Sequence, residues 1–383
     1  MGQTVLILGG GVGGLVAATE LRKSLPKEHR IVLVEREASF VFAPSLLWLM
    51  TGGRTAEKIS RPLARLEKKG IELVQGEIQK IDAERREAIV DGRTLAGDFL
   101  IIALGAELAP ETIPGLAEAG HNFYTLQGAE SLRDALAGFS GGKLVVLTAA
   151  PAYKCPAAPY EAAMLLEYHC RKRRIRDATP IDLYAAEPGP MGVAGPEVSK
   201  AVRQMVEGKG IAYHPEHQVK EIDAASRRIQ FTNGAEAAYD LLAYVPPHRV
   251  PSVVREAGLA ADTGWIATDR HTMLTKHERV FALGDVVSIP LKLGKPLPKA
   301  GVFAHAQAEA VAKNIARAIT GKGAPVTFDG EGACFVETGD GKAGFGKGNF
   351  YAEPVPRVTL HPPGRRWHAA KILFEKDWLR RWF

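Results

Sequence analysis

A glycine-rich turn between an apolar segment and a helical segment constrains the fold of this chain most strongly. Residues 4–8 read TVLIL, a continuous apolar run typical of a strand buried on both faces. The turn that follows contains Gly9, Gly11 and Gly14 in a GxGxxG pattern. In such a turn the first glycine permits a tight bend, the second lets a pyrophosphate approach the backbone, and the third lets helix and strand pack closely. The backbone amides at the start of the helix over 15–24 would then face the phosphates.

A second apolar segment, residues 31–34, ends in Glu35, which follows the turn by about 20 residues. A carboxylate at that place binds the ribose hydroxyls of an adenosine. Because strand, turn, helix and acid follow one another in the required order, we expect residues 4–35 to bind the ADP half of a dinucleotide. A glycine-rich turn without a ligand is the alternative interpretation.

Segments far downstream indicate FAD rather than NAD, because parts of the chain that are distant in sequence hold a flavin. Residues 98–106 (DFLIIALGA) resemble the strand and ATG turn of flavoproteins with two dinucleotide-binding domains, with Leu104 where threonine is usual. Residues 279–285 (RVFALGD) resemble their late strand, whose final carboxylate, here Asp285, binds the ribityl chain. A helix expected over 302–319 would direct its positive end at the flavin ring. The predicted cofactor contacts are Gly9, Gly11, Gly14, Glu35, Arg36, Pro44, Ser45, Ile78, Ala103, Gly105, Gly284, Asp285, Lys299, Val302 and Ala304.

These segments also divide the chain into domains. Residues 1–108 and 265–325 would form a discontinuous FAD domain, residues 109–264 a second Rossmann-like domain, and residues 326–383 a hairpin followed by an aromatic and basic helix. The expected fold class is therefore α/β, with tandem Rossmann-like domains as in glutathione-reductase-like flavoproteins. The turn of the second domain, residues 148–156, reads TAAPAYKCP and contains no glycine. A pyrophosphate could not approach that backbone closely, so we expect no functional NAD site there.

Composition and charge narrow the choice of partners. The net charge of +6 could suit nucleic acid or anionic lipid, but the basic residues are scattered except near the C-terminus, so nucleic-acid binding is not expected. His214 and His217 have no acid or cysteine motif near them, and no metal site is predicted. The chain enters a strand at once, and no apolar stretch reaches about 18 residues, so we expect neither a secretory signal nor a membrane span.

The chain has three cysteines, of which Cys155 is placed for chemistry. It comes just before a helix expected over 158–174, where the helix dipole and the neighbouring Lys154 would lower its pKa and favour a thiolate. Cys170 lies on the same helix, about 22 Å away at about 1.5 Å per residue, too far for a disulfide. If Cys155 has a partner, that partner is Cys334. Three buried, inert cysteines are the alternative interpretation.

The chain resembles the sulfide:quinone oxidoreductases, and also the flavin subunit of flavocytochrome c sulfide dehydrogenase, over nearly its whole length. Besides the opening turn, the resemblance rests on residues 40–48 (FVFAPSLLW), 154–161 (KCPAAPYE), 284–286 (GDV), 298–304 (PKAGVFA), 331–339 (EGACFVETG) and 374–383 (FEKDWLRRWF). It implies that sulfide is oxidised to sulfane sulfur or polysulfide by a Cys155–Cys334 redox pair, and that electrons pass through FAD to a membrane quinone.

Two further residues are candidates for catalysis. Glu161, near the first turn of the helix that follows Cys155, could accept a proton from hydrosulfide, or could simply be a carboxylate stabilised by the helix dipole. Lys299 could lie by the flavin or by a quinone oxygen, or could be a solvated loop residue. Flavocytochrome-type subunits attach FAD covalently through a cysteine of the N-terminal domain, and none precedes Cys155 here, so FAD should be bound non-covalently.

The C-terminal segment suggests contact with a membrane surface. Trp367, Phe374, Trp378 and Trp382 fall on one helical stripe with basic residues around them, a pattern that suits the lipid headgroup boundary. A helix packed on the protein is the alternative, and Ile372, Leu379 and Phe383 form a second apolar side that could dock there. We expect a peripheral membrane protein, with the cytoplasmic face favoured, that could form a homo-oligomer.

Three other functions compete with sulfide oxidation by quinone. A type II NADH:quinone oxidoreductase is disfavoured by the glycine-free second turn. A sulfide dehydrogenase that delivers electrons to a cytochrome c is disfavoured because such subunits are exported and no signal peptide is expected here. A flavin-binding protein with a signalling or scaffold role would need no cysteine pair.

Overall fold

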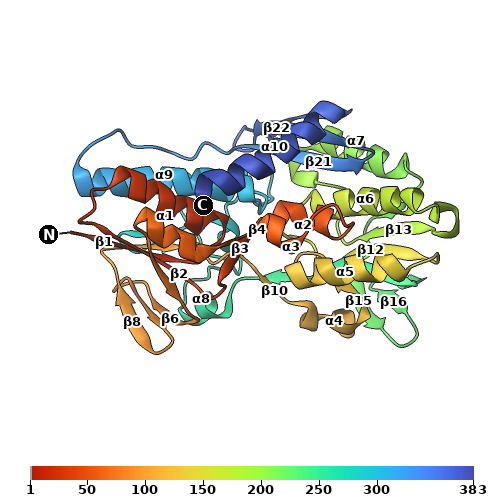
Figure 1. The fold of residues 1–383 in the computed structure, drawn as a ribbon, viewed down its shortest axis with the longest axis horizontal. Coiled ribbons are helices and arrows are strands. Elements are labelled where there is room, and N and C mark those ends of the chain that lie inside the picture. Colours follow the sequence, from red (N-terminus) through yellow and green to blue (C-terminus); the bar gives the residue numbers. More distant parts are fainter. Residues whose placement is uncertain (1) are drawn as a thin grey trace.

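A five-stranded parallel sheet forms the first half of the molecule (Figure 1). Its strand order is β20-β9-β1-β2-β5, and all its pairings are parallel. The computed structural model describes residues 2–383. Because β1 and β9 are buried on both faces, their sequences are continuous apolar runs, as predicted. The strands are β1 (Thr4–Leu8), β2 (Arg30–Glu35), β5 (Glu72–Gln75), β9 (Phe99–Ile102) and β20 (Val280–Ala282).

Two helices that are distant in sequence, α1 (Val12–Ser24) and α9 (Gly301–Thr320), pack against each other beside this sheet (Figure 1). The predicted helix over 302–319 is thereby confirmed to within one residue at each end. A small antiparallel sheet of β6 (Ile78–Asp82), β7 (Glu87–Val90) and β8 (Arg93–Ala96) completes this half. Its shorter elements are β3 (Ser39–Val41), β4 (Ser60–Pro62), α2 (Leu46–Leu49), α3 (Ala56–Ile59) and the 3-10 turns at Ala43–Ser45, Leu63–Lys69 and Gly284–Val286.

The second half repeats this plan, which confirms the tandem α/β fold. Its parallel sheet has the order β11-β18-β12-β13-β14. Its strands are β11 (His121–Asn122), β12 (Leu144–Thr148), β13 (Ile181–Ala185), β14 (Ala212–His214) and β18 (Leu241–Val245). The helices are α4 (Leu116–Ala119), α5 (Leu126–Gly138), α6 (Ala158–Lys172) and α7 (Pro196–Glu207), and a small antiparallel sheet contains β15 (Val219–Asp223), β16 (Arg228–Phe231) and β17 (Glu236–Ala238).

The two halves exchange segments near their boundary. A two-stranded ribbon of β10 (Glu107–Leu108) and β19 (His248–Arg249) joins them. Val250, Val254 on α8 (Ser252–Glu256) and Leu259 pack in the core of the first half, although the predicted boundary assigned residues up to 264 to the second. The reverse holds for residues 46–50, which pack in the core of the second half. Each core therefore includes apolar side chains from beyond the predicted boundary.

The C-terminal region is a three-stranded sheet followed by one helix. The sheet contains β21 (Glu331–Gly339), β22 (Lys342–Asn349) and β23 (Arg357–Gly364), and the helix is α10 (Arg365–Trp382). Asp340 and Gly341 form the predicted hairpin turn, with φ values of 57° and 63°, as a two-residue type I′ turn requires. Since β21 packs against α6, the hairpin brings Cys334 to the helix that follows Cys155.

Trp378 and Trp382 of the predicted stripe on α10 face the protein, so the prediction that these two rings face a membrane was wrong, whereas Phe374 of the same stripe is exposed. Trp378 and Trp382 are 5% and 0% exposed, and Trp378 stacks on Phe40 with 4.9 Å between ring centroids. Burying an indole removes a large apolar area from water, which favours packing over solvent exposure. The exposed large apolar residues of the helix are Leu373 and Phe374, at 65% and 41%. No helix within residues 2–383 is long and apolar enough to cross a bilayer.

Candidate functional site

The first glycine-rich turn has the shape that a pyrophosphate needs. Gly9 has φ of 100°, and a Cβ there would lie 2.5 Å from the Ala103 carbonyl oxygen. A Cβ on Gly14 would lie 1.8 Å from the Gly9 carbonyl oxygen, so only glycine allows the helix to approach the strand this closely. At Gly11, by contrast, a Cβ would have no atom of residues 2–383 within 4 Å beyond its chain neighbours and its own helix. The turn is closed where helix and strand meet and open where a phosphate would approach.

Glu35 and Arg36 leave the end of β2 in different directions. The Glu35 carboxylate accepts hydrogen bonds from the backbone N–H of Gly10 at 2.6 Å and of Glu37 at 3.1 Å. It therefore lies against the glycine turn, as a ribose-binding carboxylate should. Arg36 is exposed and pairs with Glu37 and Glu77 at 3.5 and 3.7 Å. Of the two, only Glu35 is held at the turn by hydrogen bonds.

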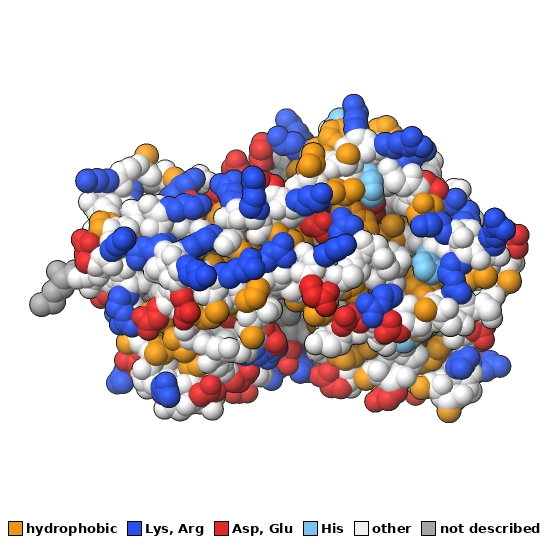
Figure 2. Space-filling model, in the orientation of Figure 1, with side chains coloured by type: hydrophobic (Ala, Val, Ile, Leu, Met, Phe, Trp, Pro, Cys, Tyr) orange, Lys and Arg blue, Asp and Glu red, His pale blue; other side chains and the backbone are white. Residues whose placement is uncertain are grey.

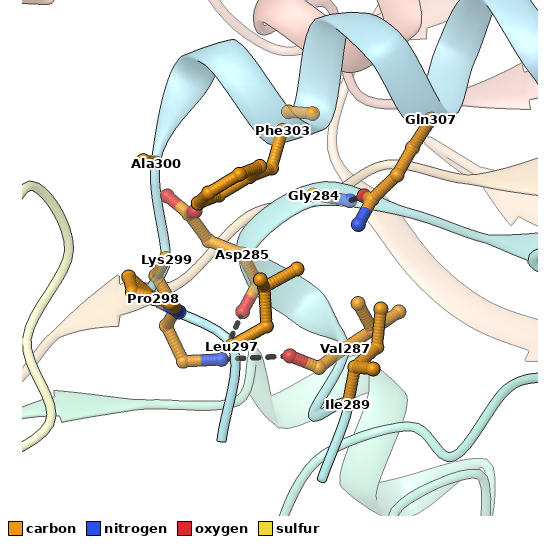
Figure 3. Close-up of a pocket in the computed structure, with 11 residues that line it drawn as sticks. Gly284, Asp285, Val287, Ile289, Leu297, Pro298, Lys299, Ala300, Phe303 and Gln307 are labelled. Carbon is orange, nitrogen blue, oxygen red and sulfur yellow. Dashed lines mark hydrogen bonds between the residues drawn. The ribbon is translucent and has the colours of Figure 1, made fainter. Parts of the chain in front are cut away.

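A pocket where β20 meets α9 contains the predicted ribityl site (Figure 3). Gly284, Asp285, Lys299, Ala304 and Gln307 line it. The Oδ1 atom of Asp285 is buried and has no hydrogen-bond partner among residues 2–383, and burial raises the pKa of this carboxyl group. Because a buried carboxylate oxygen needs a donor, the pocket suits a hydroxyl-bearing chain. Together with the open Gly11 turn, these residues fit FAD.

Lys299 lines this pocket, but its ammonium group is directed at the protein backbone (Figure 3). Lys299 Nζ donates to the carbonyl oxygens of Asp285 and Val287 at 2.7 and 2.9 Å, and it lies 3.4 Å from the centroid of the Trp265 ring. Burial lowers its pKa to about 8. The lysine is thus not the solvated loop residue of the alternative interpretation, and its contacts hold the loop of the pocket together.

The other predicted cofactor residues lie in different surroundings. Ala103 and Ala304 lie at the first turn, since both are within 3.8 Å of a Cβ placed on Gly13. Gly105 has φ of 68° and open space around it. Ser45 is buried, and its hydroxyl donates to Glu375 of α10 at 2.5 Å. Pro44 is exposed, and Ile78 and Val302 are half-buried.

Cys155 and Cys334 lie near each other although they are 179 positions apart in the sequence. The Cys155 N–H donates to the Lys299 carbonyl oxygen at 2.7 Å, which joins the second domain to the cofactor pocket. Cys334 lies on β21, which packs on α6, and Cys334 is the second-largest influence on the Cys155 pKa after burial. Both thiols are free and partly buried, whereas Cys170 is fully buried within α6.

The expected low pKa of Cys155 was wrong for this structure. Burial raises the pKa of the Cys155 thiol far above its ordinary value, with Cys334 and then Glu161 adding to the shift. Burial, followed by Glu161, raises the pKa of Cys334 to about 11. Desolvation of a thiolate outweighs the favourable field at the start of a helix because the helix dipole contributes only about 0.3–1 kcal/mol in most settings.

A buried cluster of charged side chains surrounds the two thiols. Glu161 Oε1 accepts from Lys371 Nζ at 2.9 Å and from the Glu337 N–H at 2.8 Å, and all three residues are buried. Burial lowers the pKa of Lys371, but Glu161 and Glu337 outweigh it, so the net pKa is raised. His368 Nδ1 lies 3.0 Å from Glu337 Oε2, and the histidine is 28% exposed. The cluster therefore extends from the thiols to the surface.

Sequence reasoning found Glu161 but missed Lys371, Glu337 and His368. Lys371 belongs to the basic C-terminal segment that was expected to face a membrane. It follows Trp367 by four residues and precedes Glu375 by four, so helical spacing places these charges on the same face as the tryptophans. Charged residues at helical spacing from the tryptophans were the sequence feature that could have indicated this buried cluster.

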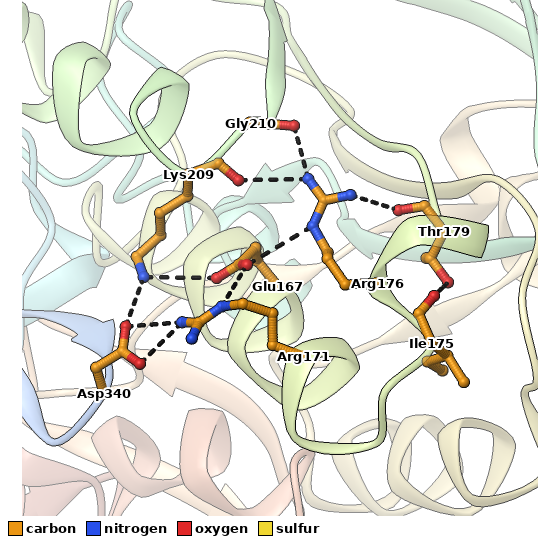
Figure 4. A network of polar contacts seen from close by, with 8 residues as sticks. All are labelled: Glu167, Arg171, Ile175, Arg176, Thr179, Lys209, Gly210 and Asp340. Atoms are coloured by element: carbon orange, nitrogen blue, oxygen red, sulfur yellow. Dashed lines mark hydrogen bonds and ion pairs between the residues drawn. The ribbon is translucent and has the colours of Figure 1, made fainter.

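A second charged cluster fixes the tip of the hairpin that contains Cys334 (Figure 4). Asp340, at the turn, pairs with Arg171 at 2.7 Å and with Lys209 at 3.1 Å. Glu167, which is 3% exposed, pairs with Arg171, Arg176 and Lys209 at 2.7, 3.6 and 3.5 Å. Since Glu167 and Arg171 belong to α6, these contacts hold β21 in register with the helix that follows Cys155.

Comparison with known proteins agrees with this architecture. Residues 3–310 match the pyridine nucleotide-disulphide oxidoreductase family. The chain is 29% identical to the sulfide-quinone reductase of Aquifex aeolicus over 402 residues, covering 99% of this chain and 91% of that protein. The X-ray structure of the sulfide:quinone oxidoreductase from Aquifex aeolicus superposes with a TM-score of 0.90 at 28% identity, again covering 99% and 91%. A type II NADH:quinone oxidoreductase of Staphylococcus aureus is 23% identical, covering 84% and 83%.

The matched family and the fit of the first turn and the Asp285 pocket make FAD the cofactor of this chain. The chain belongs to the pyridine nucleotide-disulphide oxidoreductase family and, within it, to the sulfide:quinone oxidoreductases.

Proposed function

We propose that this chain oxidises sulfide to sulfane sulfur or polysulfide at Cys155 and Cys334 and passes the electrons through FAD to a quinone. The observation that carries the proposal is the meeting of these two cysteines beside Glu161, with the Cys155 N–H bonded to Lys299 of the cofactor pocket. The sulfide-quinone reductase names of its relatives support the same substrates.

The residues suggest how the sulfur chemistry proceeds. Hydrosulfide attacks the oxidised cysteine pair, forming a persulfide on one sulfur and releasing the other as a thiolate. Glu161, whose charge acts on both thiols, takes the proton of the incoming hydrosulfide. FAD, when bound, supplies the acceptor for the two electrons that sulfide loses. The overall balance is HS⁻ plus quinone plus H⁺ giving zero-valent sulfur plus quinol.

The cluster of Glu161, Lys371, Glu337 and His368 supports proton movement at this site. One proton leaves hydrosulfide, and two are taken up by the quinone. A buried chain of ionisable groups that ends in the partly exposed His368 connects the thiols with bulk water. These residues therefore hold and move protons between the thiols and water.

The surface of α10 supports peripheral membrane binding. Leu373 and Phe374 are exposed, and Phe374 lies 6.2 Å from Phe335, the neighbour of Cys334, between ring centroids. Basic side chains spread across the face of the molecule over α1 and α10 (Figure 2). Lys69 donates to the Arg381 carbonyl oxygen at 3.4 Å, and Lys23 Nζ lies 4.9 Å from the centroid of the Trp382 ring, so both cations adjoin α10. Apolar residues among exposed cations suit an anionic lipid surface. The aromatic contact between Phe374 and Phe335 reaches from that surface to β21, which suits a lipid-soluble quinone.

Anaerobic reduction of the flavin tests the proposed function. Sulfide should bleach the flavin absorbance and NADH should not, and added quinone should restore the absorbance. Cys155→Ala and Cys334→Ala should each abolish bleaching by sulfide while retaining FAD, whereas Cys170→Ala, the matched control, should bleach normally. Bleaching by NADH without bleaching by sulfide would assign the chain to the NADH:quinone oxidoreductases instead. Restoration by a cytochrome c but not by quinone would change the electron acceptor.

A further inference from the structure

The second dinucleotide-like unit has an acidic residue in the place that Glu35 takes in the first. Glu35 ends β2, the strand that follows α1 and pairs in parallel with β1. Glu187 follows β13, which comes after α6 and pairs in parallel with β12. A carboxylate at this point of a dinucleotide-binding unit holds the ribose hydroxyls of the nucleotide. In this chain, the hydrogen bonds of Glu187 come from the protein itself.

Three hydroxyl groups of the chain bind the Glu187 carboxylate. Glu187 Oε1 accepts hydrogen bonds from the hydroxyls of Tyr153 and Tyr160, the latter at 2.7 Å, while Oε2 accepts from Thr148 at 2.9 Å. Tyr160 and Thr148 are fully buried, and Tyr153 is 7% exposed. Burial raises the pKa of both tyrosines well above the ordinary value, so both stay protonated as donors. The carboxylate thus receives from side chains the kind of hydroxyl contact that a ribose would give.

These contacts fix the turn that presents Cys155. Tyr153 lies two residues before the cysteine, and Ala152 and Cys155 have φ values of 66° and 52°, a region that side-chain-bearing residues seldom adopt. Such a conformation persists only when its surroundings hold it. The Cys155 N–H donates to Lys299, and the Cys155 carbonyl accepts from the Tyr124 hydroxyl at 3.2 Å. Glu187, through Tyr153, provides the contact on the other side of the turn.

We propose that Glu187 is a positioning residue, which binds the Tyr153 hydroxyl in place of a nucleotide ribose and thereby holds Cys155 in the orientation required for sulfur chemistry. Hydroxyl groups of the protein then take the place that a ribose would take in the second dinucleotide-like unit. The same hydrogen bonds that occupy its acidic residue keep the cysteine turn in its left-handed conformation. This role rests on the proposed function of Cys155, so its test includes a measurement that does not depend on sulfide.

Tyr153→Phe and Glu187→Ala test the proposal, with Tyr239→Phe as the control. Tyr239 is 5% exposed, and its hydroxyl has no hydrogen-bond partner among residues 2–383. Stopped-flow reduction of the FAD-loaded protein by saturating sulfide should slow by about tenfold to a hundredfold in the first two variants, because small displacements of a reacting group are costly. FAD content and the rate at which quinone reoxidises chemically reduced flavin should stay unchanged, and Glu187→Gln, which keeps an acceptor oxygen, should recover part of the rate.

The second measurement is the rate at which iodoacetamide alkylates each cysteine in the reduced protein, resolved by peptide mass spectrometry. Tyr153→Phe should change the rate at Cys155 by about tenfold or more while Cys334 keeps its rate, because only the turn of Cys155 loses its support. Wild-type rates of both flavin reduction and Cys155 alkylation in Tyr153→Phe and Glu187→Ala would overturn the positioning role. If sulfide does not reduce the wild-type flavin, the proposed function fails, and the alkylation rates still decide the role of Glu187.

Discussion

Lys371 Nζ lies 2.9 Å from Glu161 Oε1, and both side chains are buried close to Cys155 and Cys334. Removing one partner of such a buried ion pair destabilises the fold, because the other charge is left without compensation in a medium of low dielectric constant. The pair also joins α10 to α6, so the C-terminal helix contributes to the site as well as to the surface.

Lys371→Met should lower both stability and activity. Removing the cation leaves Glu161 buried without its partner, which should reduce the free energy of unfolding by about 3–5 kcal/mol. Urea unfolding and sulfide-dependent quinone reduction measure the two effects. Lys376→Met, an exposed lysine of the same helix, should change neither by much. Equal effects of the two substitutions would contradict a special role for the buried pair.

Glu161→Gln should make both thiols more reactive toward alkylation at pH 8. The Glu161 charge contributes to the raised pKa of Cys155 and of Cys334, so its removal should lower both pKa values and increase the thiolate fraction. The iodoacetamide rate of the reduced protein reports this change. Glu256→Gln, an exposed carboxylate on α8, serves as the control. A slower reaction in Glu161→Gln would contradict the electrostatic explanation.

The reduced protein should lose stability in alkaline solution. Folding raises the pKa of Cys334 from an ordinary value of 9.0 to about 11, so the folded state favours the protonated thiol. This contribution is complete below pH 9 and is lost as the pH rises through about 11. Thermal unfolding between pH 8 and 11 should show a decline that is smaller in Cys334→Ala. Identical pH profiles in the two proteins would exclude the thiol as its source.

Gly11→Ala should impair FAD binding, whereas Gly14→Ala should impair folding. A methyl group on Gly11 meets no described atom within 4 Å, whereas one on Gly14 would lie 1.8 Å from the Gly9 carbonyl oxygen. Gly11→Ala should therefore fold with an unchanged melting temperature in the absence of cofactor but bind FAD weakly, because the methyl group blocks the pyrophosphate. Gly14→Ala should destabilise the apoprotein itself. Flavin absorbance per mole of protein and the melting temperature of the apoprotein separate the two outcomes.

Leu373→Glu should weaken binding to vesicles that contain anionic lipid. Leu373 is 65% exposed on the basic face of α10, and a carboxylate there would oppose both the apolar and the electrostatic attraction. Co-sedimentation measures the bound fraction. Leu274→Glu, a 38% exposed leucine of the cofactor domain, is the matched control. Trp378→Ala should instead lower the melting temperature, because this ring is buried.

Local sequence was enough for the parts of the fold that depend on neighbouring residues. The glycine spacing at Gly9, Gly11 and Gly14 predicted the strand, turn and helix because each glycine meets a local steric requirement. The turn at Asp340 and Gly341 was predicted for the same reason. The placement of Cys155 before a helix and the absence of glycine from the second turn were also visible in the chain itself.

The surroundings of these residues depended on the tertiary structure. Helical periodicity showed that Trp378 and Trp382 share a stripe, but it could not show whether that stripe meets lipid or protein. The Cys155 pKa depends on desolvation by segments far away in sequence, which outweighs the local helix dipole. Glu187 and Lys371 gained their partners in the same way. The sequence by itself determined where the chain turns and where its cysteines, acids and glycines stand along it. Folding decided which charges and hydroxyls surround these residues, because burial and hydrogen bonding depend on distances in space.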